Sequence, residues 1–373
     1  MHEGHLTTPE MICKTLLIVI CCIMICFNIV LYTFYCIFNT ENDPRAKLKL
    51  TAPIIYCMTA FAKYVTFIIH EGDIKTCLKH VTNDWKFLAN VPNARDAMIV
   101  NAKTARKLFT VCCTILYFTS LLYHLTPLIE GNIDIDENAT IKLLINSSQL
   151  SILDQRRNHA FEIVFLLQFF GGFIICTLTI ALYGLNALLV MHTCAQMTIL
   201  MTLIKMLSGE EACKGRNVDE RLAIVVEHQT RTRSFLSLVE KTLQHGSLFD
   251  VLGCTMLICL VGYCILIEWQ DGNIANTCTF LFALISNLVN IFVLCYIGEH
   301  ITAVADQVAW TTNMLEWYRL PTNKTRNIVL IIITSHIPLK ITAGKLVVLS
   351  FRTFGNVVKS AVAYLNILRT VVE

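Results

Sequence analysis

Long apolar runs, each close to the length of a membrane-spanning helix, divide this chain into segments. A helix needs about 20 apolar residues to cross the hydrocarbon core of a bilayer. Six runs meet this length, and a seventh at 346–370, inside the C-terminal segment 343–373, is interrupted by Arg352 and Lys359. The pattern predicts an all-α membrane protein with seven transmembrane helices, of which the first six span approximately 15–38, 51–70, 108–128, 163–191, 248–267 and 277–298.

Two segments need separate interpretation. The fourth run stays uncharged from Ile163 to Ile204, which is too long for one span and too short for two spans with a comfortable loop. We expect one helix that crosses the membrane and continues into the cytoplasm; the alternative is a tight hairpin near Tyr183-Gly184. The apolar stretch 327–339 is short and contains Pro338, so it predicts a short helix, 323–339, packed beneath the membrane. It would belong to a cytoplasmic anchor region, 299–342, that follows the six-helix bundle 1–298.

Composition supports a membrane protein and argues against several other classes. Hydrophobic residues make up 55% of the chain and charged residues 15%, whereas soluble domains carry about 25% charged residues. The net charge of +3 gives no reason to expect nucleic acid as a partner. Most of the 17 cysteines lie in apolar runs without a C-x-x-C pair, so we expect no metal or other cofactor. No phosphate loop or nucleophile elbow is present, and we expect no enzymatic activity.

The distribution of basic residues predicts the orientation. With the N-terminus inside, the inner segments carry 20 Lys and Arg and the outer segments carry 7, which agrees with the preference of basic residues for the cytoplasm. The C-terminus is then extracellular. The sequons at Asn138 and Asn146 fall in the outer loop 129–160, which predicts glycosylation there. A G-protein-coupled receptor has the opposite orientation.

The last predicted span carries a polar stripe. Its positions recur at steps of three and four, which places them on one helical face. A polar face at membrane depth must contact protein, a water-filled cavity or a pore. A pore would require several subunits, because one stripe cannot enclose a lumen; the alternative is packing against helices of the same chain. The stripe comprises Lys345, Leu349, Arg352, Asn356, Lys359, Ala363, Asn366 and Thr370.

The C-terminal motifs resemble those of insect odorant receptors. The resemblance is specific in the final forty residues and diffuse elsewhere, where Asp84-Trp85, His192 with Gln196, Gly298, Trp310 and Trp317 also fit. The sister gustatory receptors, the alternative within the superfamily, typically show a Thr-Tyr start and a Gln-Phe end, which are absent here. The matching motifs are Pro338-Leu339, Ala343-Gly344, Leu349-Ser350, Thr353-Phe354, Lys359-Ser360 and Tyr364.

The resemblance implies an odorant-gated, non-selective cation channel subunit. Such a subunit would form a heterotetramer with olfactory co-receptor subunits in the plasma membrane of an olfactory neuron dendrite, surrounded by membrane lipids. Its gate would lie near the outer end of the last helix. By position relative to Tyr364, the resemblance implies gate residues Asn366, Ile367, Thr370 and Val371.

The resemblance also implies a pocket for a small volatile odorant in the outer half of the bundle. Aromatic and apolar residues should line it, although ordinary core packing is the alternative for each aromatic residue. His124 and Gln168 would bond either to an odorant or to another helix. Lys63 is expected to snorkel or pair internally and has no ligand role. The candidates are Tyr56, Phe61, Tyr117, Tyr123, His124, Phe165, Gln168, Phe169, Tyr263 and Phe280.

Overall fold

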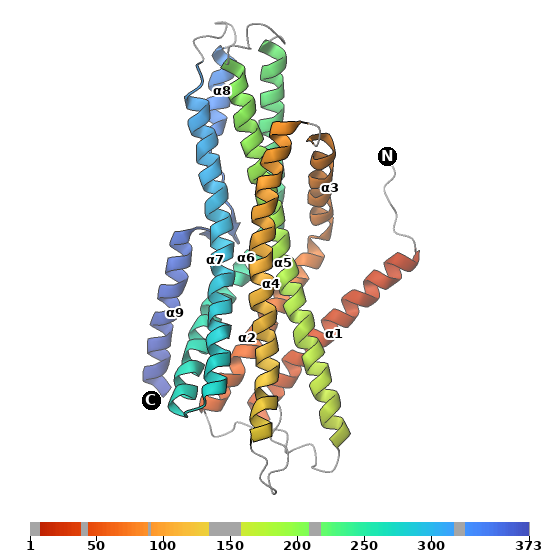
Figure 1. Ribbon diagram of the computed structural model, residues 1–373, viewed down its shortest axis with the longest axis vertical. Helices are drawn as coiled ribbons and strands as arrows, with labels where there is room; N and C mark the ends of the chain where they lie inside the picture. The colour runs from red at the N-terminus through yellow and green to blue at the C-terminus, as the bar shows by residue number, and fades with distance from the viewer. Residues whose placement is uncertain are drawn as a thin grey trace.

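The computed structural model describes residues 8–38, 44–88, 91–133, 158–208, 218–316 and 325–372. Its long helices pack side by side along one axis (Figure 1). Their bounds are α1 Thr8–Phe38, α2 Pro44–Ile69, α3 Glu71–Leu88, α4 Pro92–Ile133, α5 Asn158–Ser208, α6 Val218–Gln270, α7 Ile274–Asn313, α8 Thr325–Ser335 and α9 Phe351–Val372, with the short strands β1 Thr342–Ala343 and β2 Val347–Val348.

Six of the described helices are long and apolar enough to cross a membrane, namely α1, α2, α4, α5, α6 and α7. Each of the first six predicted spans lies almost entirely within one of them. The helix α9 is not among the six, because Arg352, Lys359 and Arg369 interrupt its apolar sequence. The fold is an all-α membrane bundle, and the seventh span stays a prediction.

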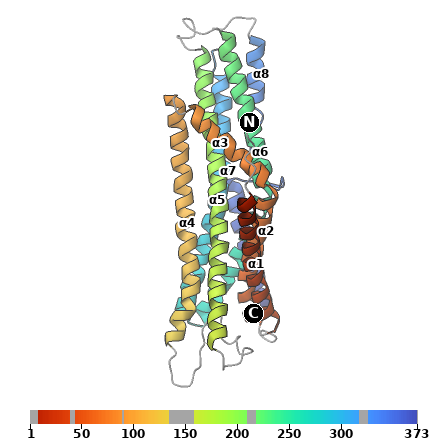
Figure 2. The same cartoon turned by 90° about the vertical axis from the view of Figure 1, so that its right-hand side faces the viewer.

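The helices α4, α5, α6 and α7 extend well beyond the predicted spans. α5 runs without a break through Tyr183 and Gly184, so the chain forms one long helix here rather than a hairpin. At the end predicted to be cytoplasmic, α5, α6 and α7 continue together and α8 lies alongside them (Figures 1 and 2). The largest buried cluster follows these helices along their length and includes Met191, Val239 and Ile301.

The segment between α8 and α9 differs from the sequence-based prediction. The α8 helix ends at Ser335 rather than Leu339, because a helix usually stops before the residue that precedes a proline, here Pro338. The last helix begins at Phe351 rather than near residue 343. Residues 342–348 instead form an antiparallel β-hairpin in which Thr342 pairs with Val348.

The hairpin turn explains the late start of α9. Gly344 and Lys345 both have φ of +60°, a left-handed conformation that cannot continue an α-helix. The Gly344 N–H donates to the Gln244 carbonyl at 2.8 Å, which fixes the turn to α6. Lys345 and Leu349 therefore lie outside α9, and their assignment to the polar stripe was wrong.

A cap defines the first turn of α9. The Ser350 hydroxyl accepts the Thr353 N–H at 3.3 Å, and the Glu299 carboxylate accepts the Phe351 N–H at 3.1 Å. Both acceptors satisfy amides that a helix leaves free at its N-terminus, and the carboxylate also favours the positive end of the helix dipole. Through Glu299, α7 holds the start of α9.

Candidate functional site

A cavity of about 140 Å³ lies among six helices. Four of the ten predicted ligand residues line it: Tyr56, Tyr123, His124 and Phe280. Apolar residues such as Ile175 and Leu257 form much of the remaining wall. The full lining is Asn28 and Tyr32 of α1; Ala52, Pro53, Tyr56 and Cys57 of α2; Leu116, Thr119, Ser120, Tyr123 and His124 of α4; Gly172 and Ile175 of α5; Leu257 and Val261 of α6; and Phe280, Ala283, Ser286, Asn287 and Asn290 of α7.

His124 forms part of the cavity wall in a fixed orientation. Its Nδ1 lies 2.7 Å from the Ser120 carbonyl oxygen, and because a carbonyl only accepts, Nδ1 carries a proton and donates. The ring meets Tyr123 and Phe169 edge to face, with centroids 5.5 and 5.3 Å apart. These contacts set the position of His124 on the α4 side of the cavity.

The cavity depends on close contacts made possible by Gly171 and Gly172 of α5. A Cβ atom on Gly172 would lie 2.7 Å from Cε1 and 2.8 Å from Nε2 of His124. A Cβ atom on Gly171 would lie 2.1 Å from the Asn28 side-chain nitrogen. The two glycines therefore leave the space that these two lining side chains occupy.

The other six predicted ligand residues do not line the cavity. Gln168 is 4% exposed and donates to the Tyr32 hydroxyl at 2.9 Å, so it links α5 to α1 behind the cavity wall. Each helix turns only part of its surface toward a central cavity, so most residues at the right depth point elsewhere. Phe61 packs against a buried cluster between α1 and α2, and Tyr263 is buried elsewhere in the bundle. Tyr117 stacks on Phe173 and forms a hydrogen bond with Thr177. Phe165 lies beside Phe169, whose ring contacts His124.

Sequence reasoning missed the polar residues of α7 that line the cavity. Ser286, Asn287 and Asn290 face it together, because residues three and four apart share one face of a helix. Polar residues at membrane depth are uncommon and face the bundle interior. Their spacing inside the apolar run 277–298 was the signal that could have identified this face.

A buried ion pair lies two helical turns from the cavity along α2. The Lys63 Nζ is 2.8 Å from the Asp250 carboxylate, and the Tyr183 hydroxyl donates to the same oxygen at 2.9 Å. Lys63 and Asp250 are 6% and 5% exposed. Lys63 is thus paired internally, and Asp250, a residue absent from the predicted candidates, joins α6 to α2 and α5.

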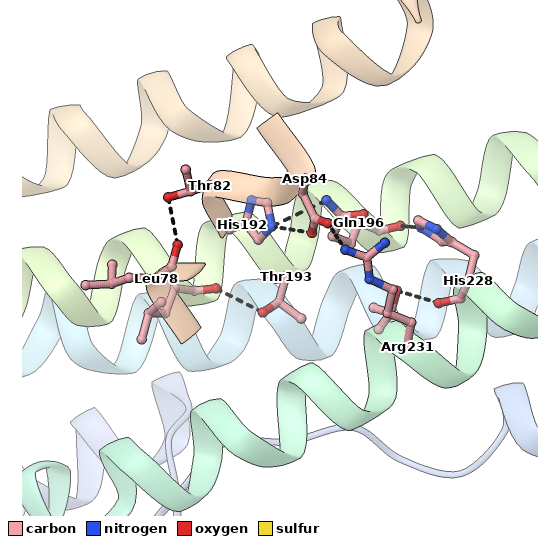
Figure 3. Close-up of polar contacts among 10 residues, drawn as sticks. Leu78, Thr82, Asp84, His192, Thr193, Gln196, His228 and Arg231 are labelled. Carbon is pink, nitrogen blue, oxygen red and sulfur yellow. Dashed lines mark hydrogen bonds and ion pairs between the residues drawn. The ribbon is translucent and has the colours of Figure 1, made fainter. Parts of the chain in front are cut away.

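A second polar cluster joins α3, α5 and α6 in the extended end of the bundle (Figure 3). Asp84 accepts from Arg231 and lies 3.0 Å from His192 Nε2. The His228 Nε2–H donates to the Gln196 carbonyl at 3.0 Å. Burial lowers the pKa of His228, which favours the neutral ring. Two features that fitted the family resemblance, Asp84 and His192, therefore form one structural contact.

The polar face of α9 is exposed on this chain. The helix packs on α6 and α7 through residues such as Val357 and Ala361, while the stripe residues that α9 contains remain accessible. This arrangement contradicts the alternative in which the stripe packs against helices of the same chain. The exposed members are Arg352, Asn356, Lys359, Ala363, Asn366 and Thr370.

The predicted gate residues lie near the C-terminal end of α9. Ile367 is 60% exposed, and Asn366 and Thr370 are exposed beside it. Val371 belongs to α9, but its side chain is outside the described part. The predicted glycosylation sites Asn138 and Asn146 also lie outside the described residues.

The bundle and its cavity define a multi-pass helical membrane protein, and comparison with known proteins identifies the family. Residues 43–362 match the family described as "7tm Odorant receptor". Odorant receptor 13a of Drosophila melanogaster is 21% identical over 331 residues, which cover 84% of this chain and 79% of that protein. The chain belongs to the insect odorant receptor family, as the C-terminal motifs predicted.

Two solved structures share the fold. The insect olfactory receptor OR5 from Machilis hrabei in complex with eugenol aligns with a TM-score of 0.73 and 14% identity, covering 94% of this chain and 88% of that chain. A second structure of that receptor aligns with a TM-score of 0.69 and 13% identity, covering 99% and 91%. At this identity, the likeness establishes the fold alone.

Proposed function

We propose that this protein is the ligand-binding subunit of an odorant-gated, non-selective cation channel. The observation that carries the proposal is the cavity of about 140 Å³ inside the bundle, because it offers a small molecule a largely apolar site. Among the described lining residues, none carries a formal charge at neutral pH. A neutral volatile molecule therefore suits this cavity better than an ion does.

The α7 helix provides a physical connection between the cavity and α9. Five of its residues between Phe280 and Asn290 line the cavity, and Glu299, further along the same helix, caps the start of α9. A ligand that favours one position of α7 would shift the population of α9 positions. Gating would then occur at the predicted constriction formed by Asn366, Ile367, Thr370 and Val371.

The exposed polar face of α9 supports assembly with other subunits. Lipid does not solvate such a face, and one helix cannot enclose a pore. We propose that α9 lines a central pore in a heterotetramer with olfactory co-receptor subunits. The complex would act in the plasma membrane. The distribution of basic residues supports an orientation with the N-terminus inside and the loop 129–160 outside, where Asn138 and Asn146 would be glycosylated.

Expression in a cell line with and without the co-receptor tests the proposal. We expect inward cation currents on application of neutral volatile molecules when the co-receptor is present, and little current when the chain is expressed alone. Surface labelling confirms that both samples reach the membrane. An absence of ligand-evoked current from surface-expressed heteromers, across a broad odorant panel, would contradict the channel role.

A further inference from the structure

The α7 wall of the cavity contains two buried polar side chains that have no hydrogen-bond partner among the described residues. Ser286 and Asn290 are 3% and 4% exposed and both line the cavity. They lie one helical turn apart, on the same face. Among the hydrogen bonds within the described part of the chain, none involves the Ser286 hydroxyl or the Asn290 amide group. Both side chains line the cavity, so a polar group of a molecule inside it would form hydrogen bonds that no described residue supplies.

Asn290 differs from other asparagines of the bundle. Asn287, its neighbour on the same helix, donates its side-chain N–H to the Ala283 carbonyl at 2.9 Å. Asn28 and Asn101 make the same bond to the carbonyls four residues earlier, also at 2.9 Å. Asn290 makes no such bond among the described residues, and its donors and acceptor remain available to a molecule in the cavity.

We infer that the cavity takes a neutral single-ring compound bearing one carbonyl or hydroxyl group, which Asn290 and Ser286 bind. Tyr56, Tyr123 and Phe280 supply aromatic walls for the ring. The cavity volume of about 140 Å³ resembles that of an apolar cavity, about 150 Å³, known to hold benzene. An ionised ligand is disfavoured, because its charge would be buried without a counter-charge in the described lining.

This inference rests on the proposed function for its site and adds the ligand class and the residues that select it. The test measures binding to the whole 373-residue chain in lipid nanodiscs, with benzaldehyde, benzyl alcohol, toluene and benzoate as probes. The readout is the ratio of benzaldehyde affinity to toluene affinity, compared between variants. Partition of each probe into lipid is the same for every variant and does not affect the comparison.

We expect Asn290→Leu to lower the benzaldehyde-to-toluene ratio about three- to tenfold, since one neutral hydrogen bond contributes about 0.5–1.5 kcal/mol. Ser286→Ala should lower the ratio of benzyl alcohol affinity to toluene affinity. Benzoate should not bind to the wild type or to either variant. Asn101→Leu is the matched control, because it removes the same amide group outside the cavity. Because Asn290 has no hydrogen-bond partner among the described residues, unliganded Asn290→Leu should be at least as heat-stable as the wild type. If Asn290→Leu unfolds, the affinity ratio of Ser286→Ala is used to test the inference instead.

Unchanged ratios in Asn290→Leu and Ser286→Ala would overturn the inference and indicate that water satisfies both side chains. Failure of the three neutral probes to bind, or binding of benzoate as tight as that of benzaldehyde, would overturn it as well. Neither result depends on ion conduction. If the chain shows the expected ligand selectivity but no current, only the proposed channel role is contradicted. If it conducts but the affinity ratios are unchanged, only the role of Asn290 and Ser286 in ligand binding is contradicted.

Discussion

At the scale of single residues, the Lys63–Asp250 pair makes the sharpest stability prediction. Lys63→Met leaves the Asp250 carboxylate buried with the Tyr183 hydroxyl as its remaining hydrogen-bond partner within the described part of the chain. Removing one member of a buried pair costs about 3–5 kcal/mol, because an uncompensated charge remains. We expect a clear fall in the thermal unfolding temperature of the purified protein.

The double variant Lys63→Met/Asp250→Asn tests the cause. It removes both charges and keeps an oxygen for the Tyr183 hydroxyl, so most of the lost stability should return. Lys75→Met is the control, since Lys75 pairs with Glu71 at 2.7 Å with a side chain that is 57% exposed; such a pair contributes about 0.5 kcal/mol or less. A double variant as unstable as the single one would refute the charge explanation.

Gly172 makes a prediction about the shape of the cavity. In Gly172→Ala, the new methyl group would overlap the His124 imidazole, which must move. Such overpacking lowers the free energy of unfolding by about 1–3 kcal/mol. The displaced imidazole also changes the shape of the cavity wall. We expect the dose–response curve of an agonist to shift about tenfold or more toward higher concentration.

Truncation of the displaced ring relieves the overlap, so Gly172→Ala/His124→Ala should regain the thermal stability that Gly172→Ala loses. Gly72→Ala on α3 is the matched control, because a Cβ atom there meets nothing within 4 Å. An unaltered dose–response curve in Gly172→Ala would show that the contact with His124 does not shape the ligand site.

At the scale of helices and strands, the apolar pattern predicted more of the fold than of the site. Length and hydrophobicity located six long apolar helices, because a helix that crosses a bilayer must match its thickness. The 342–348 hairpin was not predicted, because its turn depends on a hydrogen bond from the Gly344 N–H to the carbonyl of Gln244, a residue distant in sequence. Which residues line the cavity depends on how each helix is rotated about its axis, and a helix that is apolar on nearly all sides gives little sign of this rotation. On α7 the polar residues Ser286, Asn287 and Asn290 did mark the inward face, but the prediction overlooked them.

The helix α9 carries the prediction about gating. Ile367 is exposed near the outer end of the predicted pore helix, and apolar constrictions block ions by excluding water. Ile367→Ala should widen the constriction and raise the current recorded without ligand. Val358→Ala is the control on the same helix, since nine residues place it on the opposite side. Unchanged basal current and permeability would count against Ile367 at the gate.

At the scale of the whole molecule, the charges of α9 bear on how many copies can line one pore. Arg352 and Lys359 are exposed, and with Asn366 they recur every seven residues along one side of the helix. Rings of these cations from identical subunits would repel permeant cations. This repulsion is an argument for the proposed heteromer, in which co-receptor subunits would supply part of the lumen.

The variant Arg352→Gln/Lys359→Gln removes both charges and keeps polar side chains of similar length. If the two residues face the lumen, single-channel cation conductance of the heteromer should rise, and the chain expressed alone should gain measurable ligand-evoked current. Lys340→Gln is the control, because Lys340 is exposed but lies outside α9. Conductance and selectivity equal to those of the wild type would place the basic residues away from the lumen. The need for partner subunits would then have to arise from the contacts between chains rather than from electrostatic repulsion in the pore.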